Sequence, residues 1–118
     1  MILVDTSIWV DHLRAADPRL VQVLNRDEVL IHPLVIGELS LGAMRNRTEI
    51  MRLLSKLPLA PVAEHDEVIA TINKRRLFGT GIGWVDAHLI ASALLARAGL
   101  MTRDKALLRV AKATGIAS

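Results

Sequence analysis

Short runs of apolar residues alternate with longer segments of helical periodicity along the whole chain. Five of these runs have the length and composition of short strands: residues 1–4, 29–31, 59–63, 100–102 and 116–117. Pro61 interrupts the third run and cannot donate a hydrogen bond to a ladder, so we expect this strand near a sheet edge.

Apolar positions three or four residues apart predict helices between these strands. The predicted helices span residues 7–15, 18–25, 34 to 44 or 45, 48–57, 66–77, 84 or 85 to 98, and 104–112. Asp66 is the expected N-cap of the fifth helix, and Gly99 is the expected end of the sixth. Strands that alternate with helices predict an α/β fold, with a mainly parallel sheet and helices on both faces.

The composition fits one small domain over residues 1–118. Hydrophobic residues make up 52% of the chain, more than a domain of this size hides alone, which predicts a surface covered by a second copy or another protein. The absence of cysteine excludes disulfides and thiolate zinc sites. Because no apolar run reaches the ~18 residues of a membrane span and residues 1–5 do not resemble a signal peptide, we expect a cytoplasmic protein without membrane contact.

Four acidic residues fall where the predicted fold brings distant segments together. Asp5 directly follows the first strand, and Asp104 lies two residues after the strand 100–102. Asp86 lies in the first turn of the helix that leads back to that strand, and Glu38 in the second turn of the helix after residues 29–31. Because the carboxyl ends of parallel strands meet at one edge, all four acids are predicted at one rim of the sheet.

Helix capping is the alternative explanation for two of these acids. Asp86 and Asp104 stand at helix starts, where capping and the helix dipole favour aspartate by about 0.3–2 kcal/mol. Glu38 stands too deep in its helix to cap it, and its neighbours are apolar on nearly all sides, so we expect it to be buried. A buried carboxylate needs a cation, a hydrogen-bond donor or a proton.

Asp5 is not needed as a cap, because the hydroxyls of Thr6 and Ser7 follow it. Clustered carboxylates without histidine or cysteine partners repel one another unless a hard cation such as Mg²⁺ or Mn²⁺ neutralises them. One or two such ions, ~4 Å apart if two, suit the hydrolysis of a phosphodiester. Either hydroxyl could orient a water molecule or a phosphate oxygen.

The histidines, the glycine-rich loop and the basic runs add no second site. His88 is two residues from Asp86, so the two side chains point apart on a helix. The other histidines are expected at the surface or in loops: His12, His32 and His65. Residues 79–83 lack the Lys-Ser or Lys-Thr of a Walker A loop. The basic runs at 45–56 and 74–76 fit either solvated helix faces or a rim that contacts phosphates.

Four segments together match a known family. They are Ile2-Leu3-Val4-Asp5-Thr6-Ser7, the helix with Glu38, Val85-Asp86-Ala87-His88-Leu89-Ile90-Ala91-Ser92-Ala93, and Met101-Thr102-Arg103-Asp104 followed by Leu107-Leu108. In this order and spacing, the whole chain resembles a PIN domain and, within that group, the VapC toxins of type II toxin–antitoxin pairs.

The resemblance implies a PIN-like three-layer sandwich around a five-stranded, mainly parallel sheet. It also implies a Mg²⁺- or Mn²⁺-dependent endoribonuclease that cleaves RNA, a homodimer, and a VapB-like antitoxin that covers the site. The catalytic and metal-binding acids would be Asp5, Glu38, Asp86 and Asp104.

Two other functions stay open on the residues alone. An aspartyl-phosphate phosphohydrolase or a receiver-like domain could use Asp5 as the phosphate acceptor, but no second aspartate follows two residues later and only Lys105 could supply the lysine. A non-catalytic PIN-like module that binds RNA or protein could use the acids for a purely structural metal.

Overall fold

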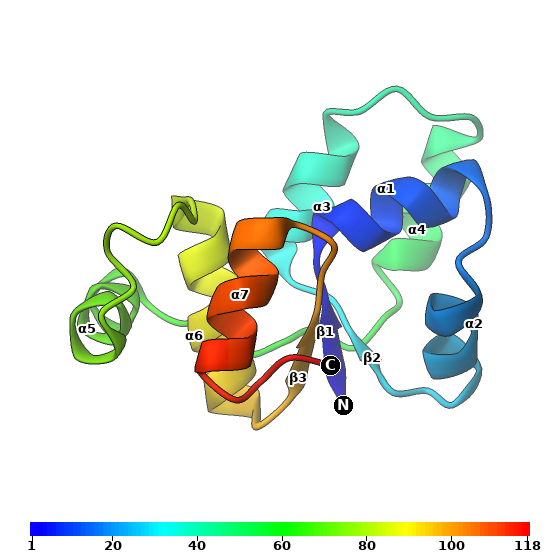
Figure 1. Ribbon diagram of the computed structural model, residues 1–118. Helices are drawn as coiled ribbons and strands as arrows, with labels where there is room; N and C mark the ends of the chain where they lie inside the picture. The colour runs from blue at the N-terminus through cyan, green and yellow to red at the C-terminus, as the bar shows by residue number, and fades with distance from the viewer.

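A three-stranded parallel sheet lies at the centre of the computed structural model, which describes all 118 residues. Strand β1 (Ile2–Val4) lies between β2 (Val29–Leu30) and β3 (Gly99–Met101), as Figure 1 shows. Both pairings are parallel, so the three strands end at the same edge of the sheet. This confirms the predicted parallel sheet and the shared carboxyl edge.

The sheet has three strands, and the expected five-stranded sheet was wrong in its count. The other two segments are reduced to single parallel bridges at the outer edges, between Ile31 and Leu59 and between Leu100 and Ala117. In the first of these segments, Pro58 and Pro61 flank the residues beside the bridge, Leu59 and Ala60. Because proline has no N–H to donate, pairing cannot extend there into a ladder.

Seven helices cover the two faces of the sheet. They are α1 (Thr6–Arg14), α2 (Pro18–Asn25), α3 (Pro33–Ser40), α4 (Arg47–Leu54), α5 (His65–Arg75), α6 (Trp84–Ala96) and α7 (Lys105–Ala113). Figure 1 shows α1 to α4 on one side of the strands and α5 to α7 on the other, which gives three layers. The longest helix, α6, has 13 residues, and none of the helices is long and apolar enough to span a bilayer.

Helix α3 ends at Ser40, several residues earlier than the apolar pattern predicts. The guanidinium of Arg47 donates to the Ser40 carbonyl through Nε at 3.2 Å and Nη2 at 2.8 Å. A side chain from the next helix therefore satisfies a terminal carbonyl that a further turn would otherwise use.

Two other helix boundaries differ from the expectation. Helix α5 begins at His65 rather than after Asp66, and the Glu67 carboxylate accepts the N–H of Glu64 at 2.9 Å. Helix α6 is closed by Arg97 in the left-handed region, at φ 52°, while Gly99 already begins β3. A Cβ at Gly99 would stand 2.9 Å from the Cβ of Ser118, so glycine there permits a close approach between chain segments.

Candidate active site

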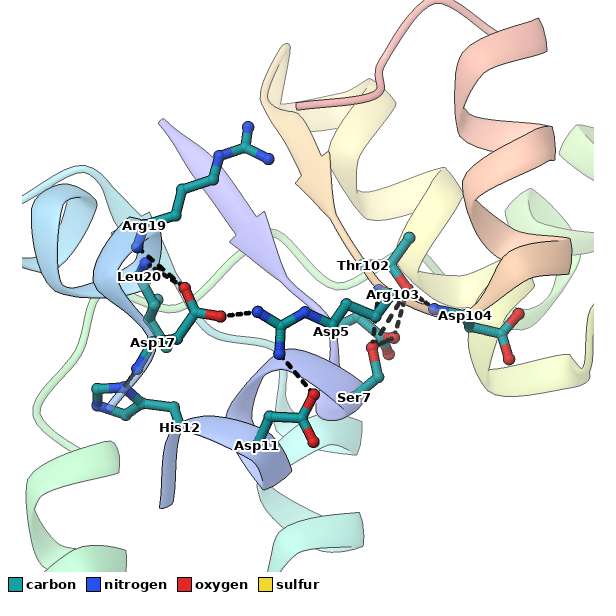
Figure 2. A network of polar contacts seen from close by, with 10 residues as sticks. All are labelled: Asp5, Ser7, Asp11, His12, Asp17, Arg19, Leu20, Thr102, Arg103 and Asp104. Atoms are coloured by element: carbon teal, nitrogen blue, oxygen red, sulfur yellow. Dashed lines mark hydrogen bonds and ion pairs between the residues drawn. The ribbon is translucent and has the colours of Figure 1, made fainter. Parts of the chain in front are cut away.

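Asp5 is held at the carboxyl end of β1 by two hydroxyl groups. Its side chain is buried, with 6% of the residue exposed, and Oδ2 accepts hydrogen bonds from Ser7 Oγ and Thr102 Oγ1, both at 2.7 Å. Figure 2 shows both hydroxyls directed at this carboxylate. Asp5 is the N-cap residue of α1 but makes no side-chain cap hydrogen bond. The expectation that Thr6 or Ser7 caps this helix was wrong, because both lie within α1 and donate their hydroxyls to Glu38 and Asp5 instead.

The same two hydroxyls also bind the segment that joins β3 to α7. Ser7 Oγ accepts the backbone N–H of Arg103 at 3.0 Å, and Thr102 Oγ1 accepts the backbone N–H of Asp104 at 3.0 Å. Asp5, from the first strand, and Asp104, from the far end of the chain, are thus linked through one threonine. Sequence reasoning missed Thr102, and its place at the end of a strand, two residues before an acid, was the available signal.

Glu38 is exposed, and the expectation that it is buried was wrong. Val35 and Leu39 turn one side of α3 to the core, whereas Glu38 lies on a part of the helix that the core does not cover. Leu41, just beyond the helix, is 89% exposed. The Glu38 carboxylate is nevertheless held in place, because Thr6 Oγ1 donates to its Oε1 at 2.7 Å.

Asp104 and Asp86 both cap helices. Asp104 is exposed at the N-cap of α7, where its Oδ1 accepts the N–H of Leu107 at 2.9 Å. Asp86 is half-buried in the first turn of α6, and its Oδ2 accepts the N–H of Gly83 at 3.0 Å. In both residues the second carboxylate oxygen has no hydrogen-bond partner within the chain.

The electrostatics of Asp86 connect all four acids. Partial burial is the main cause that raises its pKa, and the N–H of Gly83 opposes this shift. The negative charges of the other three acids raise the pKa of Asp86 further: Asp5, Asp104 and Glu38. The structure therefore brings the four predicted acids into one electrostatic neighbourhood.

The spacing of these acids is open rather than tight. No three histidine, aspartate or glutamate side chains lie close enough together to enclose a metal ion by themselves. Each of the four acids commits one oxygen to a protein donor and leaves the other without one. Carboxylate oxygens suit Mg²⁺ and Mn²⁺, and Mg²⁺ usually keeps several waters beside one or two carboxylates, so the residues fit a hydrated hard cation.

His32 lies in the link between β2 and α3, as expected of a loop residue, but it is fully buried rather than at the surface. It is the N-cap of α3, and its Nδ1 accepts the N–H of Leu34 at 3.0 Å. Burial, and to a lesser degree the neighbouring His88, lower the pKa of His32 to about 4. The imidazole is therefore a neutral structural acceptor at ordinary pH.

A groove opens beside Glu38, between α1 and the segment that joins α3 to α4. Its volume is about 710 Å³. Most of its lining is apolar, with charged groups at the rim: Val10, Leu13, Arg14, Glu38, Leu39, Gly42, Ala43, Met44, Arg45 and Ile50. An apolar surface therefore adjoins Glu38 directly.

Comparison with known proteins gives one consistent result. The PIN domain family profile matches residues 2–113. Ribonuclease VapC32 of Mycobacterium tuberculosis, strains CDC 1551 / Oshkosh and ATCC 25618 / H37Rv, is 52% identical over an alignment of 118 positions, which covers 99% of this chain and 95% of the relative.

Two solved structures share the fold at 22% sequence identity. PAE2754 from Pyrobaculum aerophilum aligns with a TM-score of 0.59 over 92% of this chain and 78% of its own. FitAB, solved bound to an IR36 DNA fragment, aligns with a TM-score of 0.65 over 95% of this chain and 91% of its own.

Proposed function

This chain belongs to the PIN-domain family and is a VapC-type ribonuclease, and on that premise we propose that it cleaves RNA internally with the help of a divalent metal ion. In this proposal it is the toxin of a toxin–antitoxin pair. The observation that carries the chemistry is the set of four carboxylates, each of which has one oxygen on a protein donor and the other without one. Partial burial is the main cause that raises the pKa of Asp86, and the charges of Asp5, Asp104 and Glu38 raise it further. Carboxylates that repel one another in this way attract a hard cation.

Mg²⁺ or Mn²⁺ would be held by Asp5, Glu38, Asp86 and Asp104, and it would supply an activated water and neutralise charge on the phosphate. The chain's own contribution is to fix these ligands. Ser7 and Thr102 hold one oxygen of Asp5, which leaves Oδ1 free, and Thr6 does the same for Glu38. Ligands held in this way lose little freedom when an ion binds, as orienting hydrogen bonds do in other metal sites.

A cleavage assay with circular RNA tests the proposal, because only an endonuclease can open a circle. We expect cleavage with Mg²⁺ or Mn²⁺ and none with EDTA. Asp5→Asn keeps the shape of the side chain and should lower the rate by at least about a hundredfold. Asp66→Asn removes the same charge from the first turn of α5 and serves as the matched control.

Equal rates for Asp5→Asn and the parent would refute the assignment of the site. If no RNA is cut while Mg²⁺ still raises the melting temperature, the protein is instead a non-catalytic module with a structural metal.

The groove beside Glu38 supports a further part of the proposal, an antitoxin partner that covers the acids. Its apolar lining next to charged Arg14 and Arg45 fits an amphipathic segment of another protein. We expect a cognate VapB-like antitoxin to inhibit cleavage in proportion to its concentration, and Ala43→Glu in the groove to weaken that inhibition. The same proposal assigns the protein to the cytoplasm.

A homodimer through α5 is the last part of the proposal. This helix lies at one end of the molecule and packs mainly against α6 (Figure 1). Acidic residues occupy its start and basic residues its end: Glu64, Asp66, Glu67, Lys74, Arg75 and Arg76. Two copies of α5 packed antiparallel would therefore pair opposite charges, with the 39% exposed Ile69 between them. Sedimentation should give a dimer that Ile69→Lys dissociates, whereas a monomeric parent would contradict this part.

A further inference from the structure

Arg103 connects the acid-bearing segment to the other side of the domain. It stands between Thr102 and Asp104, in the short link from β3 to α7. Its guanidinium donates through Nη1 to Asp11 Oδ2 at 2.5 Å and through Nη2 to Asp17 Oδ2. Figure 2 shows the guanidinium between these two carboxylates, which come from α1 and from the start of α2.

Asp17 is a fixed anchor for this arginine. Only 5% of the residue is exposed, and its second oxygen, Oδ1, accepts the N–H groups of Arg19 and Leu20, both at 3.0 Å. Its own N–H donates to Nδ1 of His12 at 3.0 Å, which ties it to the last turn of α1. Both oxygens of the carboxylate that holds Arg103 therefore accept hydrogen bonds within the chain.

The main chain of Arg103 is fixed as well. Its N–H donates to Ser7 Oγ, the hydroxyl that donates to Asp5. The residue is thus attached at two points, through its side chain to Asp11 and Asp17 and through its backbone to Ser7. A shift of this residue would move Thr102 away from the carboxylate of Asp5.

The guanidinium of Arg103 points toward α1 and α2, which favours a positioning role over a role in binding phosphate. Both of its arms are occupied by carboxylates, so its charge is neutralised at α1 and α2 rather than offered beside Asp5. An exposed ion pair by itself contributes little. Here, however, the buried partner Asp17 and the backbone bond to Ser7 make the side chain part of the support of the acids.

We propose that Arg103 is a positioning residue of the nuclease site, which fixes the segment 102–104 against α1 and α2 so that Thr102 and Asp104 keep their places beside Asp5. This inference rests on the proposed function.

The test compares Arg103→Gln with Arg52→Gln. Arg52 is the matched control, because its guanidinium also meets a carboxylate at 2.5 Å, that of Glu49, and its side chain is 50% exposed against 49% for Arg103. We expect Arg103→Gln to lower kcat about tenfold and to weaken Mn²⁺ binding, measured by electron paramagnetic resonance, about tenfold, as loss of a ligand-orienting group typically does. Arg52→Gln should match the parent in both.

The partner variant Asp17→Asn supplies a second, independent measurement. If both residues act through one contact, the kcat of the double variant Arg103→Gln/Asp17→Asn should be no lower than that of the less active single variant. Arg103→Lys, which can reach one carboxylate but not both, should recover part of the loss.

Three results would overturn the inference. A higher KM with unchanged kcat in Arg103→Gln would show a direct contact to RNA phosphate. A lower melting temperature with unchanged kcat and Mn²⁺ affinity would show a purely structural ion pair, and a fully additive double variant would show that Arg103 and Asp17 act separately. If the parent cuts no RNA, the proposed function fails, and the Mn²⁺ affinity of Arg103→Gln then decides the positioning role by itself.

Discussion

Thr102 offers the sharpest test of how the site is built, since a single hydroxyl serves two acids. It donates to Asp5 Oδ2 and accepts the N–H of Asp104, and the residue is only 8% exposed. Thr102→Val keeps the shape of the side chain and removes both hydrogen bonds. Thr102→Ser keeps the hydroxyl and removes only a methyl group.

The cost of Thr102→Val follows from these two bonds. A hydrogen bond to a charged group contributes about 1.5–3 kcal/mol, and a neutral one about 0.5–1.5 kcal/mol. The added methyl group of valine offsets up to about 0.8 kcal/mol of this if it is fully buried. The expected net loss in the free energy of unfolding is therefore about 1–4 kcal/mol, equivalent to a fall of about 4–16 °C in Tm for a domain of this size.

Thermal unfolding followed by circular dichroism measures this loss, and the circular-RNA assay at a temperature well below both transitions measures its effect on cleavage. We expect Thr102→Val to lose cleavage as well, because Asp5 keeps only one of its two hydroxyl donors, while Thr102→Ser stays close to the parent in both assays. A Tm for Thr102→Val within about 2 °C of that of Thr102→Ser would refute the reasoning, since the hydroxyl would then contribute almost nothing.

Three further predictions concern stability. Asp86→Asn should raise Tm by about 2–4 °C while cleavage is lost, because relief from burial of a charge and from like-charge repulsion typically adds about 0.5–1 kcal/mol. Burial lowers the pKa of His32 from 6.5 to about 4, so the unfolded chain takes up a proton that the fold excludes. The fold should therefore lose up to about 3 kcal/mol as the pH falls across this interval, and His32→Asn, which keeps an acceptor at the cap, should flatten the plot of Tm against pH. Gly99→Ala should lower stability by about 1–3 kcal/mol through the clash with Ser118, whereas the control Gly37→Ala, with no neighbour within 4 Å of the new Cβ, should raise it by about 0.5–1 kcal/mol. Denaturant unfolding should show changes of opposite sign in the free energy of unfolding of the two glycine variants. Changes of the same sign would contradict the prediction for this pair.

The features that the sequence predicted well depend on neighbours along the chain. A short apolar run followed by an acid predicts both β1 and the place of Asp5 at its end. Pro18 and Pro33 mark the first turns of α2 and α3, because the fixed φ of proline suits that position. Asp86 and Asp104 stand at helix starts as expected, since the preference for a cap is local.

The features that the sequence did not predict depend on contacts between distant segments. The carbonyl at the end of α3 is bound by Arg47, from the next helix. Glu38 is exposed although its neighbours in the sequence are apolar, because only one side of this helix packs on the core. The role of Thr102 depends on Asp5, which lies 97 positions away in the sequence. The spacing of apolar residues within one helix or strand cannot predict such a contact.

On the sequence alone, capping and metal binding are competing explanations for Asp86 and Asp104, but the geometry makes them compatible. A carboxylate has two oxygens, and in each residue one oxygen accepts a backbone N–H at the helix start while the other has no partner in the chain. The cap fixes the rotamer of the side chain and thereby the direction of the free oxygen. Asp5 and Glu38 reach the same result through hydroxyl donors. A local preference that the sequence already shows can therefore prepare a ligand, and an acid that caps a helix beside other acids is a stronger candidate for metal binding because it caps.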